Sequence, residues 1–177
     1  MEHLQYPIGR FAYGKTYSEH ETQQSIDELK DLVFHIKKVI NKFKMEDFQK
    51  TYKDDGWIAI QIINHLCDVY INAYLRTKWL LTESIPTLKP YDQNAFSQLP
   101  DSFYENVDES VDLLDCLIKR WVYLLQKVER PGFQRKIYHP ESKIYLPLDE
   151  MVAMYAWHGY HHLAHLKIIN NNAIGIL

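Results

Sequence analysis

Apolar residues recur along this chain at alternating three- and four-residue steps, the spacing that places side chains on one face of an α-helix. The first such segment begins after Ser18, which forms a capping-box pattern with Glu21. It continues for about seven turns through a seam of apolar positions: Ile26, Leu29, Val33, Ile36, Ile40 and Phe43. This pattern predicts a long amphipathic helix with one buried face.

Three further helices are predicted by the same spacing. The turn-like residues 54–56 precede a helix from about Trp57 to Thr82. A third helix begins near Asn106 or Asp108 and carries one apolar face as far as residue 125. The fourth begins at residues 147–149 and runs to about residue 170, where three consecutive asparagines and Gly175 end it.

The connections between these helices indicate how they pack. Residues 84–105 include three prolines and are too long for a tight antiparallel hairpin, so we expect this link to cross the end of the bundle. Between the third and fourth helices, residues 133–146 carry apolar pairs around the turn-like 140–142, which predicts a short β-hairpin. The expected fold is an all-α four-helix bundle with a long crossover connection, formed by a single domain over residues 1–177.

Composition narrows the classes of partner. Hydrophobic residues make up 46% and charged residues 24% of 177 residues, with a net charge of −3 and no basic stripe, which disfavours nucleic-acid and anionic-membrane binding. No apolar run approaches a membrane span, and the N-terminus lacks a signal-peptide pattern, so we expect a cytoplasmic protein. Cys67 and Cys116 both lie in apolar helical patterns, and we expect both to be reduced and buried.

Histidines are concentrated in the fourth predicted helix, where residues 157–165 hold four of the chain's nine. The pairs His158/His162 and His161/His165 both have the i, i+4 spacing that stacks two side chains on one helical face. Two imidazoles placed in this way can bind one first-row metal ion. His161 and His165 are the rival ligand pair, which spacing alone does not exclude. Because His161 lies off the inward seam of this helix, we assign it and His165 to supporting or substrate-pocket roles.

The second predicted helix offers a third ligand, because His65 lies on its apolar seam. Three protein ligands leave a coordination position open, which is typical of a catalytic metal site. Asp68 lies on nearly the same face as His65 and could orient its imidazole N–H, or could be a solvated carboxylate. Arg76 lies about 16 Å from His65 by helical rise. A salt bridge is its expected role, and anchoring the anionic arm of a long substrate is the alternative.

Several motifs together resemble one known family. They are Tyr6-Pro7-Ile8-Gly9, Asp55-Gly56-Trp57, His65-Leu66 with Asp68, Asn72 to Tyr74 with Arg76, Pro90-Tyr91-Asp92, Tyr138-His139-Pro140, Trp157-His158, His161-His162 and Ala164-His165. With these motifs the chain resembles, nearly end to end, the bacterial YfiT-like proteins of the DinB-like superfamily.

The resemblance implies one zinc or nickel ion per chain, held by His65, His158 and His162, and a homodimer. Two positions depart from the family pattern. Ile58 stands where relatives often have Thr or Ser, so we expect Asp55 to cap the helix. Tyr160 replaces a histidine of close relatives.

Three neutral imidazoles leave the charge of the ion uncompensated, so that a bound water or thiol loses a proton easily. The resemblance implies a metal-dependent hydrolase that acts on a small electrophilic substrate, with His161, His165 and Asp68 as candidate catalytic residues. The first alternative is a metal-dependent S-transferase that uses a low-molecular-weight thiol such as bacillithiol. The second is a non-enzymatic dimer in which the metal is structural or sensed, which the lack of a fourth protein ligand disfavours.

Overall fold

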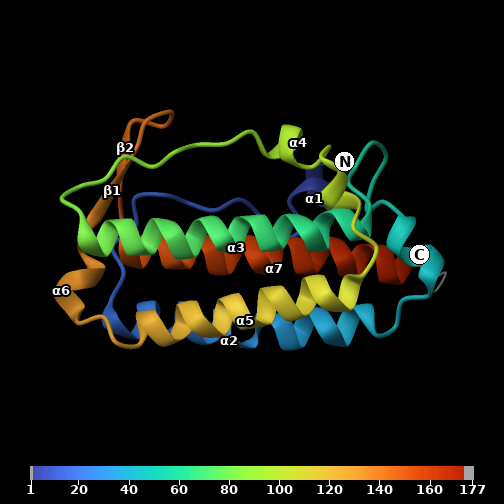
Figure 1. Ribbon diagram of the computed structural model, residues 1–177, viewed down its shortest axis with the longest axis horizontal. Helices are drawn as coiled ribbons and strands as arrows, with labels where there is room; N and C mark the ends of the chain where they lie inside the picture. The colour runs from blue at the N-terminus through green and yellow to red at the C-terminus, as the bar shows by residue number, and fades with distance from the viewer. Residues whose placement is uncertain (1, 174–177) are drawn as a thin grey trace.

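The computed structural model describes residues 2–173, in which four long helices pack side by side as a bundle (Figure 1). These helices are α2 (Glu19–Ile40), α3 (Ala59–Thr82), α5 (Val107–Leu125) and α7 (Leu148–Ala173). Each buries an apolar face against the common core. The predicted all-α four-helix bundle is confirmed. None of the described helices is both long and apolar enough to cross a membrane.

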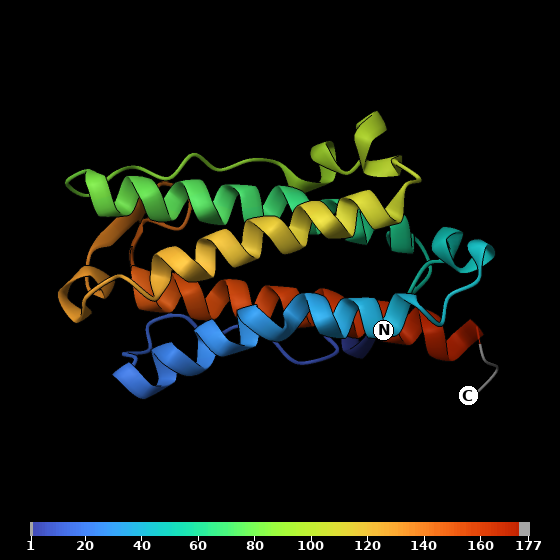
Figure 2. The same ribbon diagram turned by 60° about the horizontal axis from the view of Figure 1, so that its bottom comes forward.

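The helices do not alternate in direction along the chain. α2 and α7 run the same way, and α3 and α5 both run the opposite way (Figures 1 and 2). Hydrogen bonds between α3 and α5 agree, because Ser110 donates to Asn64 near the start of both helices and Trp121 donates to Thr77 farther along both. Since α3 is antiparallel to α7, the N-terminal half of α3 faces the middle of α7.

Residues 83–106 return along the length of the bundle, beside α3 (Figure 1). This connection contains α4 (Gln93–Phe96) and the 3₁₀ helix η2 (Pro100–Phe103). One end is held by the Leu88 amide, which donates to the Tyr138 carbonyl, and the other by the Gln61 side chain, which donates to the Ser97 carbonyl. The prediction that this link crosses only the end of the bundle was wrong, because two consecutive parallel helices require the chain to travel back over their full length.

The short elements complete the fold. Strands β1 (Lys136–His139) and β2 (Ile144–Pro147) pair antiparallel, with Ile137 opposite Leu146 and both side chains buried, so the predicted hairpin is confirmed. The other elements are α1 (Glu2–Gln5), the 3₁₀ helix η1 (Met45–Gln49) and α6 (Arg130–Phe133).

Helix α2 begins as its sequence predicted. The Ser18 hydroxyl accepts from the Glu21 amide at 3.2 Å, and the Glu21 carboxylate accepts from the Ser18 amide at 2.9 Å. The helix ends at Ile40, and Phe43 packs against the core from the segment that follows. The capping box is therefore confirmed, while the seam extends past the last helical turn.

Helix α3 begins differently from the prediction. Ile58 is its N-cap residue, and the Gln61 side-chain oxygen accepts from the Ile58 amide at 3.1 Å. Asp55 lies in the preceding turn with a φ of +56°, so the prediction that it caps this helix was wrong. At the other end of the chain, α7 continues past the predicted stop at residue 170, and Gly175 lies outside the described residues.

The two cysteines have different surroundings. Cys67 is buried, and its thiol lies 3.2 Å from the Ser110 carbonyl oxygen. Cys116 is exposed, so the prediction that both are buried was wrong. Cys116 lies two positions beyond the buried Leu114, and two residues turn the helix by about 200°. This rotation places Cys116 on the outer face of α5.

Candidate metal centre

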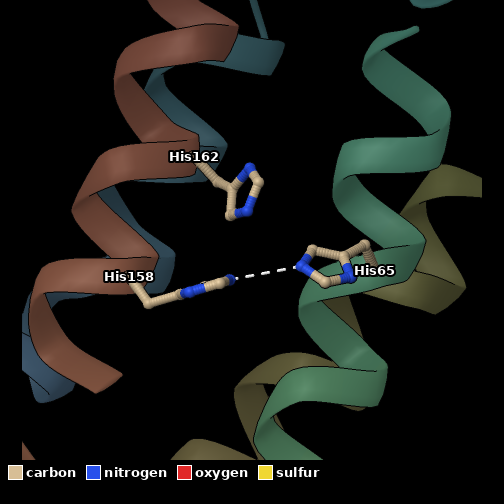
Figure 3. Close-up of side chains that lie close together, drawn as sticks. All are labelled: His65, His158 and His162. Atoms are coloured by element: carbon tan, nitrogen blue, oxygen red, sulfur yellow. Dashed lines mark hydrogen bonds between the residues drawn. The ribbon is translucent and has the colours of Figure 1, made fainter. Parts of the chain in front are cut away.

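Three histidines from two helices converge between α3 and α7. Nε2 of His65 lies 3.2 Å from Nε2 of His158, and His162 points one ring nitrogen toward the same space (Figure 3). One potential ligand atom from each of the three lies within 4.8 Å of the others. The i, i+4 spacing on α7 and the antiparallel packing of α3 together produce this arrangement.

The geometry fits a divalent cation. Nitrogens bound about 2.0–2.1 Å from one tetrahedral zinc ion lie about 3.3 Å apart, close to the 3.2 Å between His65 and His158. Neutral imidazole is a preferred ligand of both zinc and nickel. The donor set therefore suits one such ion, which His65, His158 and His162 would hold with a coordination position left for another molecule.

Burial keeps these imidazoles unprotonated. Burial, together with the neighbouring histidines, lowers the pKa of His65 to about 4 and that of His158 to about 3. Burial also lowers the pKa of His162 well below its ordinary value, again with the help of adjacent imidazoles. At neutral pH each ring therefore has a lone pair available for a metal ion.

A hydrogen-bond chain orients the ring of His162. His165 Nε2 lies 3.3 Å from the Gln5 carbonyl oxygen, which can only accept, so His165 donates there. His165 Nδ1 then accepts from His162 Nδ1, which lies 3.4 Å away. This network assigns the hydrogen of His162 to Nδ1 and leaves the lone pair of Nε2 free to bind a metal ion. The Tyr52 ring stacks on His165, with centroids 3.9 Å apart, and fixes its plane.

Two tryptophans enclose the centre. The ring of Trp57 lies edge-on to His65 at 4.7 Å between centroids and parallel to His162 at 6.0 Å. The ring of Trp157 stacks on His161 at 4.9 Å. Within residues 2–173, Trp157 Nε1 and His161 Nδ1 are buried without a hydrogen-bond partner. His161 thus presents an unused polar atom beside the three converging histidines.

A cavity of about 410 Å³ adjoins the imidazoles. It is lined by His158, His161 and His162 together with polar residues from elsewhere in the chain, including Tyr6, Lys53, Asp55 and Asn94. An incoming molecule can therefore reach the side of the ring cluster. His161, His162 and His165 form a second group whose nitrogens lie within 4.8 Å of one another. Because both groups include His162, the four histidines of α7 and His65 form one continuous site.

The structure does not place Asp68 at this site. Asp68 lines a different cavity, together with Asp101 and Glu109, and it makes no hydrogen bond to His65 within the described chain. Burial, followed by the charge of Asp101, raises the pKa of its carboxyl group. Three residues advance an α-helix by about 300°, and this offset of about 60° from His65 turns Asp68 away from α7. Its expected role in orienting His65 is therefore not supported.

Arg76 also differs from its expected role. Among the described side chains, residues 3–170, no carboxylate oxygen lies within 4.0 Å of its guanidinium, so the predicted salt bridge was wrong. Arg76 instead donates to the Tyr155 hydroxyl at 2.7 Å and to the Lys89 carbonyl at 2.9 Å.

Two contributors to the site were missed by the sequence reasoning. They are Trp57, which the sequence alone does not distinguish from an ordinary core residue, and Gln5, which lies in the first 17 residues, where no periodicity marks a buried face. The position of Trp57 immediately before a histidine-bearing helix is the signal that could have found it. A backbone carbonyl such as that of Gln5 leaves no signal in a sequence.

Comparison with known proteins gives a consistent result. The family model described as the DinB superfamily matches residues 18–166. A protein of Bacillus mycoides named "Putative metal-dependent hydrolase" is 38% identical over 166 residues, which are 94% of this chain and 95% of that protein. A protein of the same name from Bacillus thuringiensis subsp. konkukian is 37% identical over equal shares.

Solved structures show the same fold. YfiT from Bacillus subtilis, described as a probable metal-dependent hydrolase with an unusual four-helix bundle topology, superposes with a TM-score of 0.93. The two sequences are 32% identical, and the match covers 98% of each chain. A mycothiol-dependent maleylpyruvate isomerase superposes with a TM-score of 0.64 at 15% identity, over 85% of this chain and 63% of that one, and this likeness concerns the fold alone.

Proposed function

The chain belongs to the DinB superfamily, and from this premise we propose that it is a metal-dependent hydrolase of small molecules. In this proposal His65, His158 and His162 hold one zinc or nickel ion. The convergence of these three buried, unprotonated imidazoles beside a cavity is the observation that carries the proposal. The names of the relatives and the fold of YfiT support it.

The bound ion would supply a Lewis acid and lower the pKa of a water ligand toward neutrality. The protein's own residues orient the ligand rings and shield them from water. His165 and the Gln5 carbonyl hold the His162 ring in one tautomer, and Trp57 excludes water from the side of the rings that it covers. A fixed ring orientation keeps the ligand atoms aimed at one point, as metal-binding histidines require.

His161 is the candidate for proton transfer. It lines the cavity, its Nδ1 has no partner among the described residues, and burial lowers its pKa to about 3. The ring is thus neutral at pH 7, so it can accept a proton from the attacking nucleophile and then pass that proton to the leaving group. The residues between His158 and His162 include no glutamate, so proton transfer cannot use a carboxylate within this pair, as it does in zinc proteases with an H-E-x-x-H helix.

Metal content and turnover test this proposal. The untagged protein is purified, its zinc and nickel are quantified, and hydrolysis of 4-nitrophenyl acetate and 4-nitroacetanilide is measured. We expect one ion per chain and ester or amide hydrolysis. His158→Ala should lose both while remaining folded. His20→Ala is the matched control, because His20 is exposed at the start of α2, and it should retain both.

Other outcomes would contradict the proposal. Conjugation of a low-molecular-weight thiol to a generic electrophile, without any hydrolysis, would assign the metal centre to S-transfer. Unfolding of His158→Ala, together with no turnover by the metal-loaded wild type, would assign the ion to a structural role.

A further inference from the structure

Arg76 is a buried charge without an opposite charge. Its side chain is 8% exposed, and no carboxylate lies within 4.0 Å of it in the described part of the chain. Its two hydrogen bonds go to neutral groups, the Tyr155 hydroxyl and the Lys89 carbonyl. Burying an unpaired charge is costly, so proteins rarely do so without a partner or a ligand.

Arg76 lines a cavity of about 220 Å³ that also touches His158. Tyr155, the hydrogen-bond partner of Arg76, precedes His158 by three residues on α7, which corresponds to about 4.5 Å of helical rise. The other walls include apolar side chains of Val69, Leu88 and Met151. Polar side chains such as Gln93 and Ser142 line it as well. The cavity therefore has mixed walls, with Arg76 on one side and a metal-ligand candidate on another.

These features define the ligand. Guanidinium binds an anionic oxygen pair through two parallel N–H donors. A single positive charge matches a carboxylate, whereas a phosphate monoester carries nearly two negative charges at pH 7. Glu141, which is exposed and also lines this cavity, further disfavours a dianion. The apolar part of the wall, formed by residues such as Val69, Leu88 and Met151, suits a short hydrocarbon chain attached to that carboxylate.

We propose that Arg76 forms a carboxylate-binding subsite, so that the substrate carries a carboxylate joined by a short apolar chain to the group that reacts at the histidine centre. That the bound carboxylate belongs to a substrate rests on the proposed function. The binding of a carboxylate to the cavity does not depend on it. The ring of Tyr91, whose centroid lies 5.6 Å from the Arg76 guanidinium carbon, forms another wall of the subsite.

Binding to metal-free protein tests the subsite apart from catalysis. After chelator treatment, hexanoate, 1-hexanol and hexyl phosphate are titrated by calorimetry at constant ionic strength. Hexanoate should bind wild type more tightly than either other probe. Arg76→Met should weaken hexanoate by about tenfold or more, which is typical for loss of a charge-assisted hydrogen-bond pair. Arg120→Met is the control, because Arg120 is exposed on α5, and it should bind as wild type does.

The proposal would be overturned by no binding of hexanoate to wild type, by equal binding of 1-hexanol, or by unchanged hexanoate affinity in Arg76→Met. Tighter binding of hexyl phosphate would also overturn it, in favour of a phosphate subsite. If Arg76→Met does not fold, Arg76→Lys decides, because lysine keeps the charge but loses the planar fork. Hexanoate binding weakened in Arg76→Lys supports the subsite, and unchanged binding refutes it. Failure of the hydrolase proposal is separate, because it appears as absent hydrolysis of the neutral ester.

Discussion

The metal-free protein should lose stability steeply between pH 7 and pH 5. The reason is the group of buried imidazoles at the centre of the bundle, whose pKa values lie below the ordinary histidine value of 6.5. Above pH 6.5 both the folded and the unfolded chain keep these rings neutral. Below it the unfolded chain takes up protons that the folded chain excludes, so falling pH favours unfolding.

The size of the effect can be worked out for two of these rings, His65 and His158. With folded pKa values of about 4 for His65 and about 3 for His158, each ring lowers the free energy of unfolding by about 2 kcal/mol at pH 5. Together they remove about 4 kcal/mol. Domains are stable by about 5–15 kcal/mol in total, so this loss is large enough to measure easily.

Urea unfolding of chelator-treated protein, followed by far-ultraviolet circular dichroism at pH 7 and pH 5, measures this loss. His158→Gln is the informative variant, because it keeps a polar side chain but removes one titrating ring. Its stability should fall by about 2 kcal/mol less than that of wild type over the same range. Equal pH dependence of wild type and variant would refute the reasoning and show that the imidazoles already titrate normally in the folded chain.

Three further outcomes follow from the packing. Gly159→Ala should lower the unfolding free energy by about 1–3 kcal/mol in urea titrations, because an added Cβ would lie 2.4 Å from the Tyr70 hydroxyl oxygen. Ser18→Ala should cost about 1 kcal/mol through loss of the helix cap, measured as a lower thermal midpoint. A thiol-reactive dye should label the exposed Cys116 in the native protein and Cys67 only after denaturation, because burial raises the pKa of Cys67 to about 12. Labelling of both thiols before denaturation would contradict this.

Local patterns predicted the features that depend on helical periodicity. The spacing of His158 and His162, the apolar seam that carries His65 and the capping box at Ser18 all translate directly into positions along and around a helix. The convergence of the histidines then required only that α3 and α7 be neighbours. These spacings join residues a few positions apart in one helix, so they can be predicted from the sequence.

Features that depend on the relative placement of helices were not predictable in this way. The length of residues 83–106 does not encode whether the following helix is parallel or antiparallel to the preceding one. Asp68 lies only about 60° around the helix from His65, and only the assembled bundle shows that this rotation places it at another cavity. The partner of Arg76 depends in the same way on the path of the returning chain. The exposure of Cys116, by contrast, follows from its offset of about 200° from the buried Leu114 and could have been predicted from the sequence.

The single domain over residues 1–177, the homodimer, the small-molecule or thiol partner, the lack of nucleic-acid and membrane partners and the cytoplasmic location stay predictions. Size-exclusion chromatography with light scattering measures the mass of the particle in solution. A mass of one chain would contradict the homodimer.

The returning connection between α3 and α5 separates two tasks within one small protein. It contributes Leu88 and Tyr91 to the cavity at Arg76 and Asn94 to the cavity at the histidines, but none of the three converging ligands. Loops accept insertions and exchanges far more readily than packed helices do. A related protein with a different connection would therefore bind a different molecule beside the same three histidines. Its selectivity would change while its reaction type stayed the same.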